Sequence, residues 1–336
     1  MPARTLQTAG ITGVGMSFPE RRLTNADLET MVETNDAWIV ERTGIRERRI
    51  VEKGVGASFH GAKAAEQALE HAGLKPADID LIIVPTVTPD MMFPATACLI
   101  QHMIGADKAW GYDLEAACSG FVFALQNARA QVECGFARRV LVIGTEVMSA
   151  ITDYTDRNTC ILFGDGAGAV VVEAVAPERV GFIDAILRVD GSGAHLLKMD
   201  GGGSRLPPSA ESLAAGKHFI FQEGREVYKF AVKGMANVTA EIVEKNGFTG
   251  RDVDLFVPHQ ANLRIIEAAQ RRVGLEDRQV GVTIDRFGNT TSASIPSCLR
   301  VALEDGRLQE GSLVVATSFG AGFTWGSVLL RWNAPL

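Results

Sequence analysis

Short runs of apolar residues recur along the chain, bounded by charged residues, glycine or proline. Four of them are nearly continuous and lack the alternation typical of a strand with one face in water. Such runs predict strands that are buried on both faces, as in the sheets of an α/β protein. They are Leu81–Val84, Val140–Ile143, Val170–Val172 and Leu313–Ala316.

Other segments repeat apolar residues with the period of a helix, which predicts amphipathic helices. These segments are Gly61–His71, Ser119–Cys134, Arg225–Asn246, Leu263–Val273 and Ile295–Glu304. The long segment Asp190–Gly224 has neither period and contains the glycine- and proline-rich run Gly201–Pro208. We expect an irregular surface excursion there, and long loops of this kind often line binding sites.

Two parts of the chain resemble each other. Ala77–Pro85 and Arg251–Pro258 both contain an acidic turn and an apolar strand that stops at proline. A strand followed by a glycine-rich turn and a second strand occurs both in Arg138–Val172 and in Leu313–Leu330. Chance similarity in a glycine-rich α/β protein is the alternative explanation. We predict two similar βα halves, residues 1–180 and 181–336, packed as alternating helix and sheet layers around a pseudo-twofold axis.

The composition narrows the class of protein. Of the 336 residues, 46% are hydrophobic, which suits one large or two medium α/β domains. A net charge of −7 gives no general support for nucleic-acid binding. No apolar run reaches the ~18 residues that span a bilayer, and the N-terminus lacks the apolar core of a signal peptide. The five cysteines are scattered without a CxxC pair, which argues against zinc or a disulfide framework and favours the cytoplasm.

Cys118 is the first candidate for chemistry. It lies between a predicted strand and a long predicted helix, with small neighbours that leave room for a substrate. A thiol at a helix N-terminus faces unpaired N–H groups and the positive end of the helix dipole, which favours the thiolate. A buried structural thiol is the alternative, because free cysteines are usually of that kind.

Two polar residues lie far downstream in apolar or glycine-rich settings. His259 follows the strand that ends at Pro258, and Asn289 lies in the turn Phe287–Thr291. Taken singly, the first fits a core histidine and the second fits a turn residue. A Cys, a His and an Asn from three distant segments indicate acyl transfer through a thioester.

The ordered motifs of the chain resemble those of β-ketoacyl-acyl carrier protein synthase III, a condensing enzyme of the thiolase superfamily. The motifs are Trp38–Arg46, Ala116–Gly120, Thr155–Arg157, Phe163–Gly168, Pro258–Arg264, Gly288–Ala293 and Phe319–Gly326. The resemblance covers nearly the whole chain. It implies the thiolase-like fold, in which helices and two sheets alternate in five layers and the N-terminal half carries the nucleophile.

The resemblance also implies the reaction, a decarboxylative condensation that initiates type II fatty acid synthesis. Cys118 would attack an acyl-CoA, with acetyl-CoA as the expected primer, and the backbone N–H groups of Cys118 and Ala321 would bind the oxyanion. His259 and Asn289 would donate hydrogen bonds to the thioester carbonyl of malonyl-acyl carrier protein. No metal or organic cofactor is implied. The family often has glycine in place of Ala321, so we expect a φ below zero there.

Contacts with coenzyme A follow from the same resemblance. Trp38 and Arg157 would sandwich the adenine, and Arg42 would bind a phosphate. Asn262 would bind the pantetheine arm, although a helix N-cap is an equally good role. Phe93 would limit the acyl pocket of a partner subunit, which implies a homodimer, whereas ordinary core packing is the alternative.

An acidic carrier protein requires a basic landing site on this acidic chain. Basic residues recur on one face of each of two predicted helices. They are Lys229, Lys233, Arg264, Arg271 and Arg272. A solvated helix face explains such charges as well, but the docking region of the family falls on the same helices.

Three other functions remain open. A degradative thiolase needs a second reactive cysteine near the C-terminal glycine loop, and Phe319–Gly326 has none; a chalcone-type synthase is usually longer. A related acyltransferase of secondary metabolism would transfer the acyl group without decarboxylation. A non-catalytic partner subunit of a condensing complex would typically lack the nucleophile that Cys118 provides.

Overall fold

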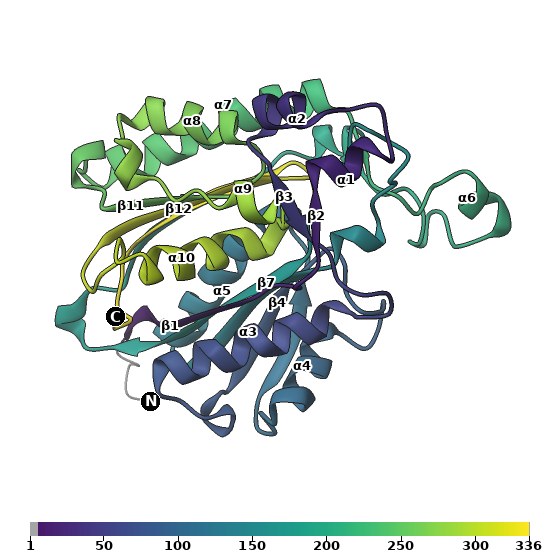
Figure 1. Ribbon diagram of the computed structural model, residues 1–336. Helices are drawn as coiled ribbons and strands as arrows, with labels where there is room; N and C mark the ends of the chain where they lie inside the picture. The colour runs from purple at the N-terminus through teal and green to yellow at the C-terminus, as the bar shows by residue number, and fades with distance from the viewer. Residues whose placement is uncertain (1–5, 336) are drawn as a thin grey trace.

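The computed structural model describes residues 6–335. Helices and sheets alternate in layers, with one sheet from each half of the chain and a pair of helices between the two sheets (Figure 1). This arrangement confirms the predicted α/β class and the layered architecture.

The first sheet has five strands in the order β1-β7-β6-β4-β5. Strand β4 is parallel to β5 and β6, whereas β7 is antiparallel to both β6 and β1. The strands are β1 (Thr8–Ser17), β4 (Leu81–Pro85), β5 (Trp110–Leu114), β6 (Arg139–Glu146) and β7 (Gly166–Val175). Every residue of β4 is buried, as its continuous apolar run predicted.

The second sheet repeats this pattern in the order β11-β12-β13-β8. Strand β11 is parallel to β12, and β13 is antiparallel to β12 and β8. The strands are β8 (Phe182–Val189), β11 (Leu255–Pro258), β12 (Leu313–Gly320) and β13 (Thr324–Arg331). A single parallel bridge between Phe256 and Val280 stands where β5 would have its counterpart. The repeated order confirms the two similar halves; the division at residue 180 stays a prediction.

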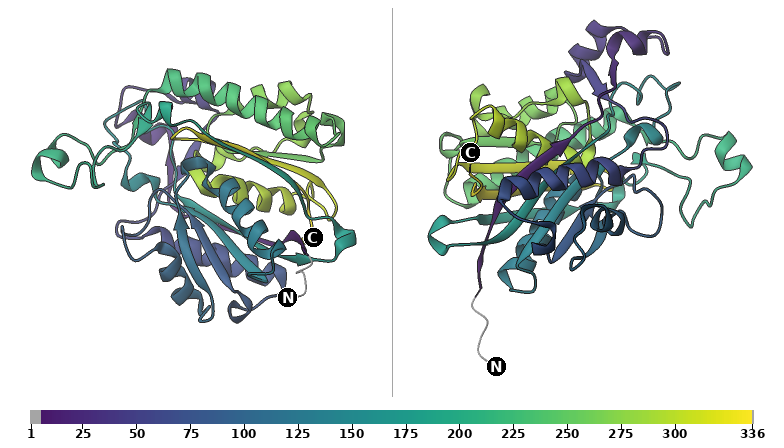
Figure 2. Two further views of the ribbon diagram at one scale, coloured as in Figure 1. Left: turned by 180° about the vertical axis from the view of Figure 1, so that it is seen from behind. Right: turned by 60° about the horizontal axis from the view of Figure 1, so that its bottom comes forward.

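Three pairs of helices form the remaining layers (Figures 1 and 2). Helices α3 (Ala57–Ala72) and α4 (Thr96–Ile104) cover the outer face of the first sheet. Helices α7 (Gly224–Lys245) and α8 (Leu263–Val273) cover the outer face of the second. Helices α5 (Gly120–Glu133) and α10 (Ser294–Glu304) pack between the sheets in the largest apolar cluster. All five predicted helices are present, with ends displaced by no more than a turn.

The segment predicted to be irregular is largely so. It contains a two-stranded antiparallel sheet of β9 (Leu197–Lys198) and β10 (Phe221–Gln222), which sequence reasoning missed, and a short helix α6 (Ala210–Ala214) between the two strands. The part between the two strands projects from the body of the molecule (Figure 1).

The smaller elements lie outside the layers. Helices α1, α2 and α9 and strands β2 and β3 are Asn25–Glu29, Asp36–Thr43, Ile284–Phe287, Arg22–Thr24 and Glu47–Arg49. Among residues 6–335, no helix is long and apolar enough to cross a membrane. Within the same range, no group of three or more His, Cys, Asp and Glu side chains is placed to hold a metal ion.

Candidate active site

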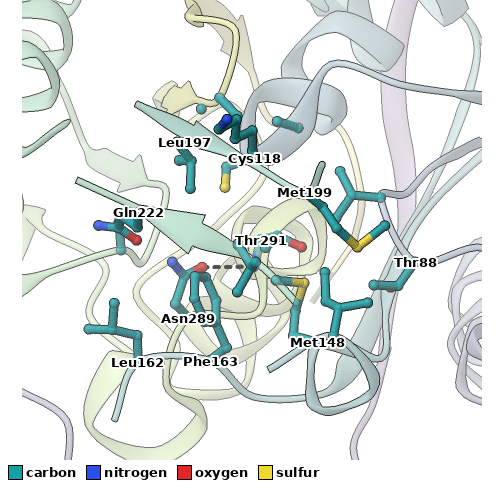
Figure 3. A pocket seen from close by; sticks show the side chains of 18 of the residues that line it. Thr88, Cys118, Met148, Leu162, Phe163, Leu197, Met199, Gln222, Asn289 and Thr291 are labelled. Carbon is teal, nitrogen blue, oxygen red and sulfur yellow. Dashed lines mark hydrogen bonds between the residues drawn. The ribbon is translucent and has the colours of Figure 1, made fainter. Parts of the chain in front are cut away.

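Cys118 lies in a tight turn between β5 and α5. The turn is a short 3₁₀ helix, Ala117–Ser119, and Ala117 has a φ of +48°. This left-handed conformation is unfavourable for a residue with a Cβ, and such strain is concentrated at functional sites. The thiol points from this turn into a cavity (Figure 3).

The C-terminal hairpin β12–β13 holds this turn in place. Ser318 donates a hydrogen bond to the Cys118 carbonyl at 2.7 Å, and Thr324 donates to the Ala116 carbonyl at 2.8 Å. In the other direction, the Ser119 hydroxyl donates to the Thr324 carbonyl at 2.9 Å. The position of Cys118 therefore depends on residues about 200 positions away in the sequence.

The expectation that the helix N-terminus lowers the pKa of Cys118 is wrong. Burial raises the pKa of the Cys118 thiol to about 12, and the carboxylate of Glu146 raises the same pKa further. The thiol's own backbone N–H acts in the opposite direction, but it is a smaller influence. Desolvation of the charged form exceeds the help from nearby N–H groups, so the resting group is a neutral thiol.

Sequence reasoning missed Glu146, which ends β6 and is fully buried. Its carboxylate accepts hydrogen bonds from the Thr88 hydroxyl at 2.6 Å, the Ser292 hydroxyl at 2.8 Å and the Val87 N–H at 3.1 Å. These donors come from both halves of the chain. A carboxylate at the end of an otherwise apolar strand was the available signal, because buried acids are rare without such partners.

His259 immediately follows β11 and is buried. Its backbone N–H donates to the Thr317 carbonyl at 2.8 Å, and its Nδ1 lies 2.7 Å from the Ser294 hydroxyl oxygen. Its Nε2 has no hydrogen-bond partner among the residues that the structure describes. Burial lowers the pKa of His259 to about 3, so the ring is neutral at physiological pH.

Asn289 is oriented by two backbone contacts. Its N–H donates to the Leu162 carbonyl at 2.9 Å, and its Oδ1 accepts from the Thr291 N–H at 2.9 Å (Figure 3). With the oxygen engaged in this way, the Nδ2 group is the part of the amide left to donate to a ligand. Thr291 has a φ of +46°, a strained value for a β-branched residue.

One cavity of about 1690 Å³ brings these residues together. Cys118, His259 and Asn289 all line it, and so does Trp38 near the surface. Part of the irregular segment, Leu197–Met199, also contributes to the wall of this cavity. The cavity exceeds the ~300–1,000 Å³ of an ordinary small-molecule pocket, so it has room for a long ligand.

Comparison with known proteins identifies the family to which this chain belongs. Two family profiles, 3-oxoacyl-[acyl-carrier-protein (ACP)] synthase III and its C-terminal part, match residues 112–201 and 243–332. Proteins of Koribacter versatilis and Symbiobacterium thermophilum, both named beta-ketoacyl-[acyl-carrier-protein] synthase III, are 48% and 50% identical over 98% of this chain and 99% of their own length. The chain belongs to this family. It is a condensing acyltransferase with a thiolase-like fold.

Solved structures agree. The 3-oxoacyl-[acyl-carrier-protein] synthase III of Aquifex aeolicus VF5 matches with a TM-score of 0.89 and 42% identity, over 96% of this chain and 100% of that one. The priming β-ketosynthase of the R1128 polyketide pathway matches with a TM-score of 0.91 and 36% identity, over 100% of this chain and 99% of that one.

Of the residues expected to bind coenzyme A, Trp38, Arg42 and Asn262 line the cavity, and Arg157 lies against the Trp38 ring. The Arg157 guanidinium lies 4.8 Å from the centre of the Trp38 ring, and that of Arg42 lies at 5.5 Å. An adenine between Trp38 and Arg157 needs two stacking distances of ~3.5 Å each, so Arg157 must move outward to admit it. Asn262 is the N-cap of α8 through the Arg264 N–H, and its Nδ2 also donates to the Arg42 carbonyl at 2.9 Å.

The structure also shows the surroundings of Ala321 and Phe93, two further residues expected at the site. Ala321 is absent from the residues with positive φ, as expected, and its carbonyl accepts a hydrogen bond from Thr324 at 3.1 Å. Phe93 is 84% exposed and does not line the cavity of its own chain, whereas its neighbours Met91 and Met92 do. Core packing is therefore excluded as the role of Phe93 within this chain.

The basic residues of the expected docking face lie on α7 and α8, which pack against each other. Most of them face a carboxylate: Lys229 with Glu226, Arg264 with Glu41, Arg271 with Glu267 and Arg272 with Glu244. Lys233 is exposed and makes no ion pair within the described part of the chain. The face is consequently less positive than its sequence suggests.

Proposed function

We propose that this synthase condenses acetyl-CoA with malonyl-acyl carrier protein through an acyl-Cys118 intermediate and so initiates type II fatty acid synthesis. The observation that carries the proposal is the shared cavity, in which a thiol, an imidazole and an amide from three separate segments meet. The family to which the chain belongs supports the reaction class.

In the first half-reaction, the Cys118 sulfur attacks the thioester carbonyl of acetyl-CoA, and coenzyme A leaves. The backbone N–H groups of Cys118 and Ala321 bind the oxyanion of the tetrahedral intermediate. Such donors stabilise charge where it develops, and each is typically worth ~10²–10³ in rate. The N–H of Cys118 belongs to the turn that the C-terminal hairpin holds, which supports its preorganisation.

In the second half-reaction, malonyl-acyl carrier protein loses CO₂, and the enolate carbon attacks the acyl-Cys118 thioester. Asn289 donates from Nδ2 to the thioester oxygen, where negative charge accumulates. The contact of its Oδ1 with the Thr291 N–H supports this orientation. His259 donates a second hydrogen bond to the same thioester oxygen. The chemistry needs no metal or organic cofactor, since the substrates carry the thioesters.

The substrates bind at the mouth of the cavity. Trp38 and Arg157 stack on the adenine, Arg42 binds phosphate, and Asn262 meets the pantetheine arm. The carrier protein docks on the α7–α8 face, where Lys233 is a cation free of an intramolecular ion pair among the described residues.

A homodimer in the cytoplasm completes the proposal. Strand β5 pairs with β4 on one side only, so its other edge is available for a second chain. Large apolar side chains on and beside β5 are exposed, namely Trp110 and the Phe136 ring that packs against it, and Phe93 is exposed as well. An exposed apolar surface of this kind is typical of an interface.

A priming enzyme of secondary metabolism is the second candidate. The 36% identity to the R1128 priming β-ketosynthase supports it, because that likeness extends over the entire chain. The two candidates differ in the acyl acceptor and in the carrier protein they use, so turnover with malonyl-acyl carrier protein of fatty acid synthesis separates them.

Intact-protein mass spectrometry tests the proposal. After mixing with acetyl-CoA, the wild type should gain one acetyl group and Cys118→Ala should gain none. A chase with malonyl-acyl carrier protein should discharge the acetyl group and yield a β-ketoacyl product. Charging without discharge would point to another acceptor. Failure to load acetyl-CoA and a panel of longer acyl-CoAs would refute the role of Cys118.

A further inference from the structure

Arg48, the middle residue of β3, is a charged side chain with no exposure to solvent. Among residues 6–335, no carboxylate lies within ion-pair distance of its guanidinium. Burial lowers the pKa of Arg48 to about 10, so the group stays charged at physiological pH. A buried cation is costly, and packing alone would be served as well by a neutral side chain of similar size.

The guanidinium of Arg48 is held by neutral oxygen atoms. Its Nε donates to the Ile161 carbonyl at 3.1 Å, and one terminal nitrogen donates to the same oxygen. The other terminal nitrogen donates to Oδ1 of Asn25 at 2.6 Å. Hydrogen bonds from a charged donor are roughly twice as strong as those between neutral groups. The double contact therefore fixes the orientation of the Ile161 carbonyl in a place that excludes water.

The peptide that the guanidinium holds adjoins the backbone partners of Asn289. The carbonyl of Leu162, the residue after Ile161, accepts the Asn289 N–H at 2.9 Å. In return, the Asn289 carbonyl accepts the Gly164 N–H at 3.0 Å. These bonds accompany an isolated parallel bridge between Phe163 and Asn289. Residues 161–164 are therefore the backbone support on which Asn289 rests.

The aliphatic part of Arg48 supports the same turn from a second side. A Cβ on Gly288 would lie 2.9 Å from Cγ of Arg48 and 2.9 Å from the Leu162 carbonyl oxygen. Gly288 has a φ of +66°, a conformation that favours glycine. The residue before Asn289 thus fits between the arginine side chain and the carbonyl that holds Asn289, with no space for a side chain of its own.

We infer that Arg48 is a positioning residue that sets the direction of the Asn289 amide toward the substrate thioester. Arg48 is not among the residues that line the cavity, whereas Leu162, Phe163 and Asn289 are. It acts through the Ile161 peptide and through Gly288. The assignment rests on the proposed function, in which Nδ2 of Asn289 donates to the malonyl thioester oxygen. A misplacement of ~1 Å caused by a residue outside the reacting groups can cost about 10²-fold in rate.

Arg48→Lys tests the inference, because lysine keeps the charge and loses the planar fork of donors. In the proposed reaction, loading of Cys118 does not use Asn289, whereas discharge by malonyl-acyl carrier protein does. Quenched intact-protein mass spectrometry measures both steps. We expect loading at saturating acetyl-CoA within about twofold of the wild type and discharge at least about tenfold slower, part of the ~10² of a full misplacement. KM for malonyl-acyl carrier protein should change little, since the donor acts on charge that develops during the reaction.

Hydrogen-exchange mass spectrometry supplies a readout that does not depend on turnover. In Arg48→Lys, peptides that contain the N–H groups of Gly164 and Asn289 should exchange faster, whereas those of α3 should not change. Arg129→Lys is the matched control, because Arg129 on α5 also donates to a distant carbonyl, that of Ile183 at 3.4 Å. The control should leave both half-reactions and the exchange of these peptides as in the wild type.

The outcomes separate the inference from the proposed function. Three results for Arg48→Lys would each overturn the role of Arg48: discharge at the wild-type rate, equal slowing of loading and discharge, or slow discharge with unchanged exchange at Gly164 and Asn289. Failure of the proposed function is seen in the wild type instead, as absent loading or absent discharge, and the inference then fails with it.

A second variant applies if Arg48→Lys does not fold. Asn25→Ala removes one acceptor of the guanidinium and leaves its two contacts with the Ile161 carbonyl. It should slow discharge, leave loading unchanged and speed exchange at Asn289. Discharge at the wild-type rate, or equal slowing of both steps, would overturn the role of Arg48.

Discussion

Gly320→Ala tests whether the C-terminal hairpin sets the geometry of the nucleophile. A Cβ on Gly320 would lie 2.7 Å from the Cys118 nitrogen, 3.0 Å from the Ser119 nitrogen and 3.2 Å from the Ala117 Cβ. Gly320 does not have a positive φ, so the substitution adds a methyl group without backbone strain at its own position. The only perturbation is steric, because the added methyl group overlaps atoms of the turn that holds Cys118.

The size of the effect follows from these contacts. Ordinary van der Waals contact begins at 3.4 Å, so the turn and the hairpin must separate by roughly 0.7 Å at the closest pair. Overpacking of this kind costs about 1–3 kcal/mol of stability. The displaced nitrogen is a proposed oxyanion donor, and losing such a donor costs ~10²–10³ in rate. We expect acetyl loading to fall by about two orders of magnitude, with KM for acetyl-CoA little changed.

Loading is measured as the rate of acetyl-enzyme formation by quenched intact-protein mass spectrometry, and stability by thermal unfolding. Gly191→Ala is the matched control, because a Cβ there meets nothing within 4 Å and the φ is not positive. If Gly320→Ala is folded and loads acetyl-CoA at the wild-type rate, the turn tolerates this displacement and the proposed oxyanion donor is wrong.

Three further predictions concern different parts of the site. Trp38→Ala should raise KM for acetyl-CoA without slowing discharge by the carrier protein. Base stacking on an aromatic ring is worth ~1–3 kcal/mol, which is about 5–150-fold in affinity. Steady-state kinetics with each substrate varied in turn measures this effect. Glu146→Gln removes a negative charge that disfavours the Cys118 thiolate, so the pH profile of Cys118 alkylation should move to lower pH; an unmoved profile in a folded variant contradicts the electrostatic effect. Lys233→Glu should raise KM for malonyl-acyl carrier protein by roughly fivefold per lost ion pair and leave acetyl loading unchanged; equal effects on both substrates would contradict docking at this face.

Regular elements were predictable where local signals agreed. Helix α8 begins and ends where the sequence placed it, because Asn262 caps its N-terminus and Gly274, with a φ of +77°, ends it. Strand β4 was evident because it is buried on both faces. Strand β8 was not predicted, because most of its residues are only half-buried and form no continuous apolar run. Its place in the sheet is decided by pairing with β13.

Sequence reasoning identified the main polar residues of the candidate site, but it did not predict the electrostatic environment around them. Cys118 stands out from the sequence, yet the local argument from the helix N-terminus gave the wrong direction for its pKa, since burial and Glu146 are supplied by tertiary structure. The short contact between Ser294 and His259 is equally invisible in sequence, because 35 residues separate them and Ser294 looks like one more hydroxyl in a polar run.

The pKa shifts of Cys118 and His259 together limit how this enzyme reacts. Burial and the carboxylate of Glu146 raise the pKa of Cys118 to about 12, so the neutral thiol is the form that prevails at pH 7. The pKa of His259 is lowered to about 3, which disfavours the protonated ring. A resting pair of thiolate and imidazolium is therefore disfavoured by the pKa values of both residues. Both shifts arise from exclusion of water, which also strengthens every hydrogen bond made to a developing charge. Negative charge on the sulfur must therefore arise during the proposed attack itself rather than in the resting enzyme.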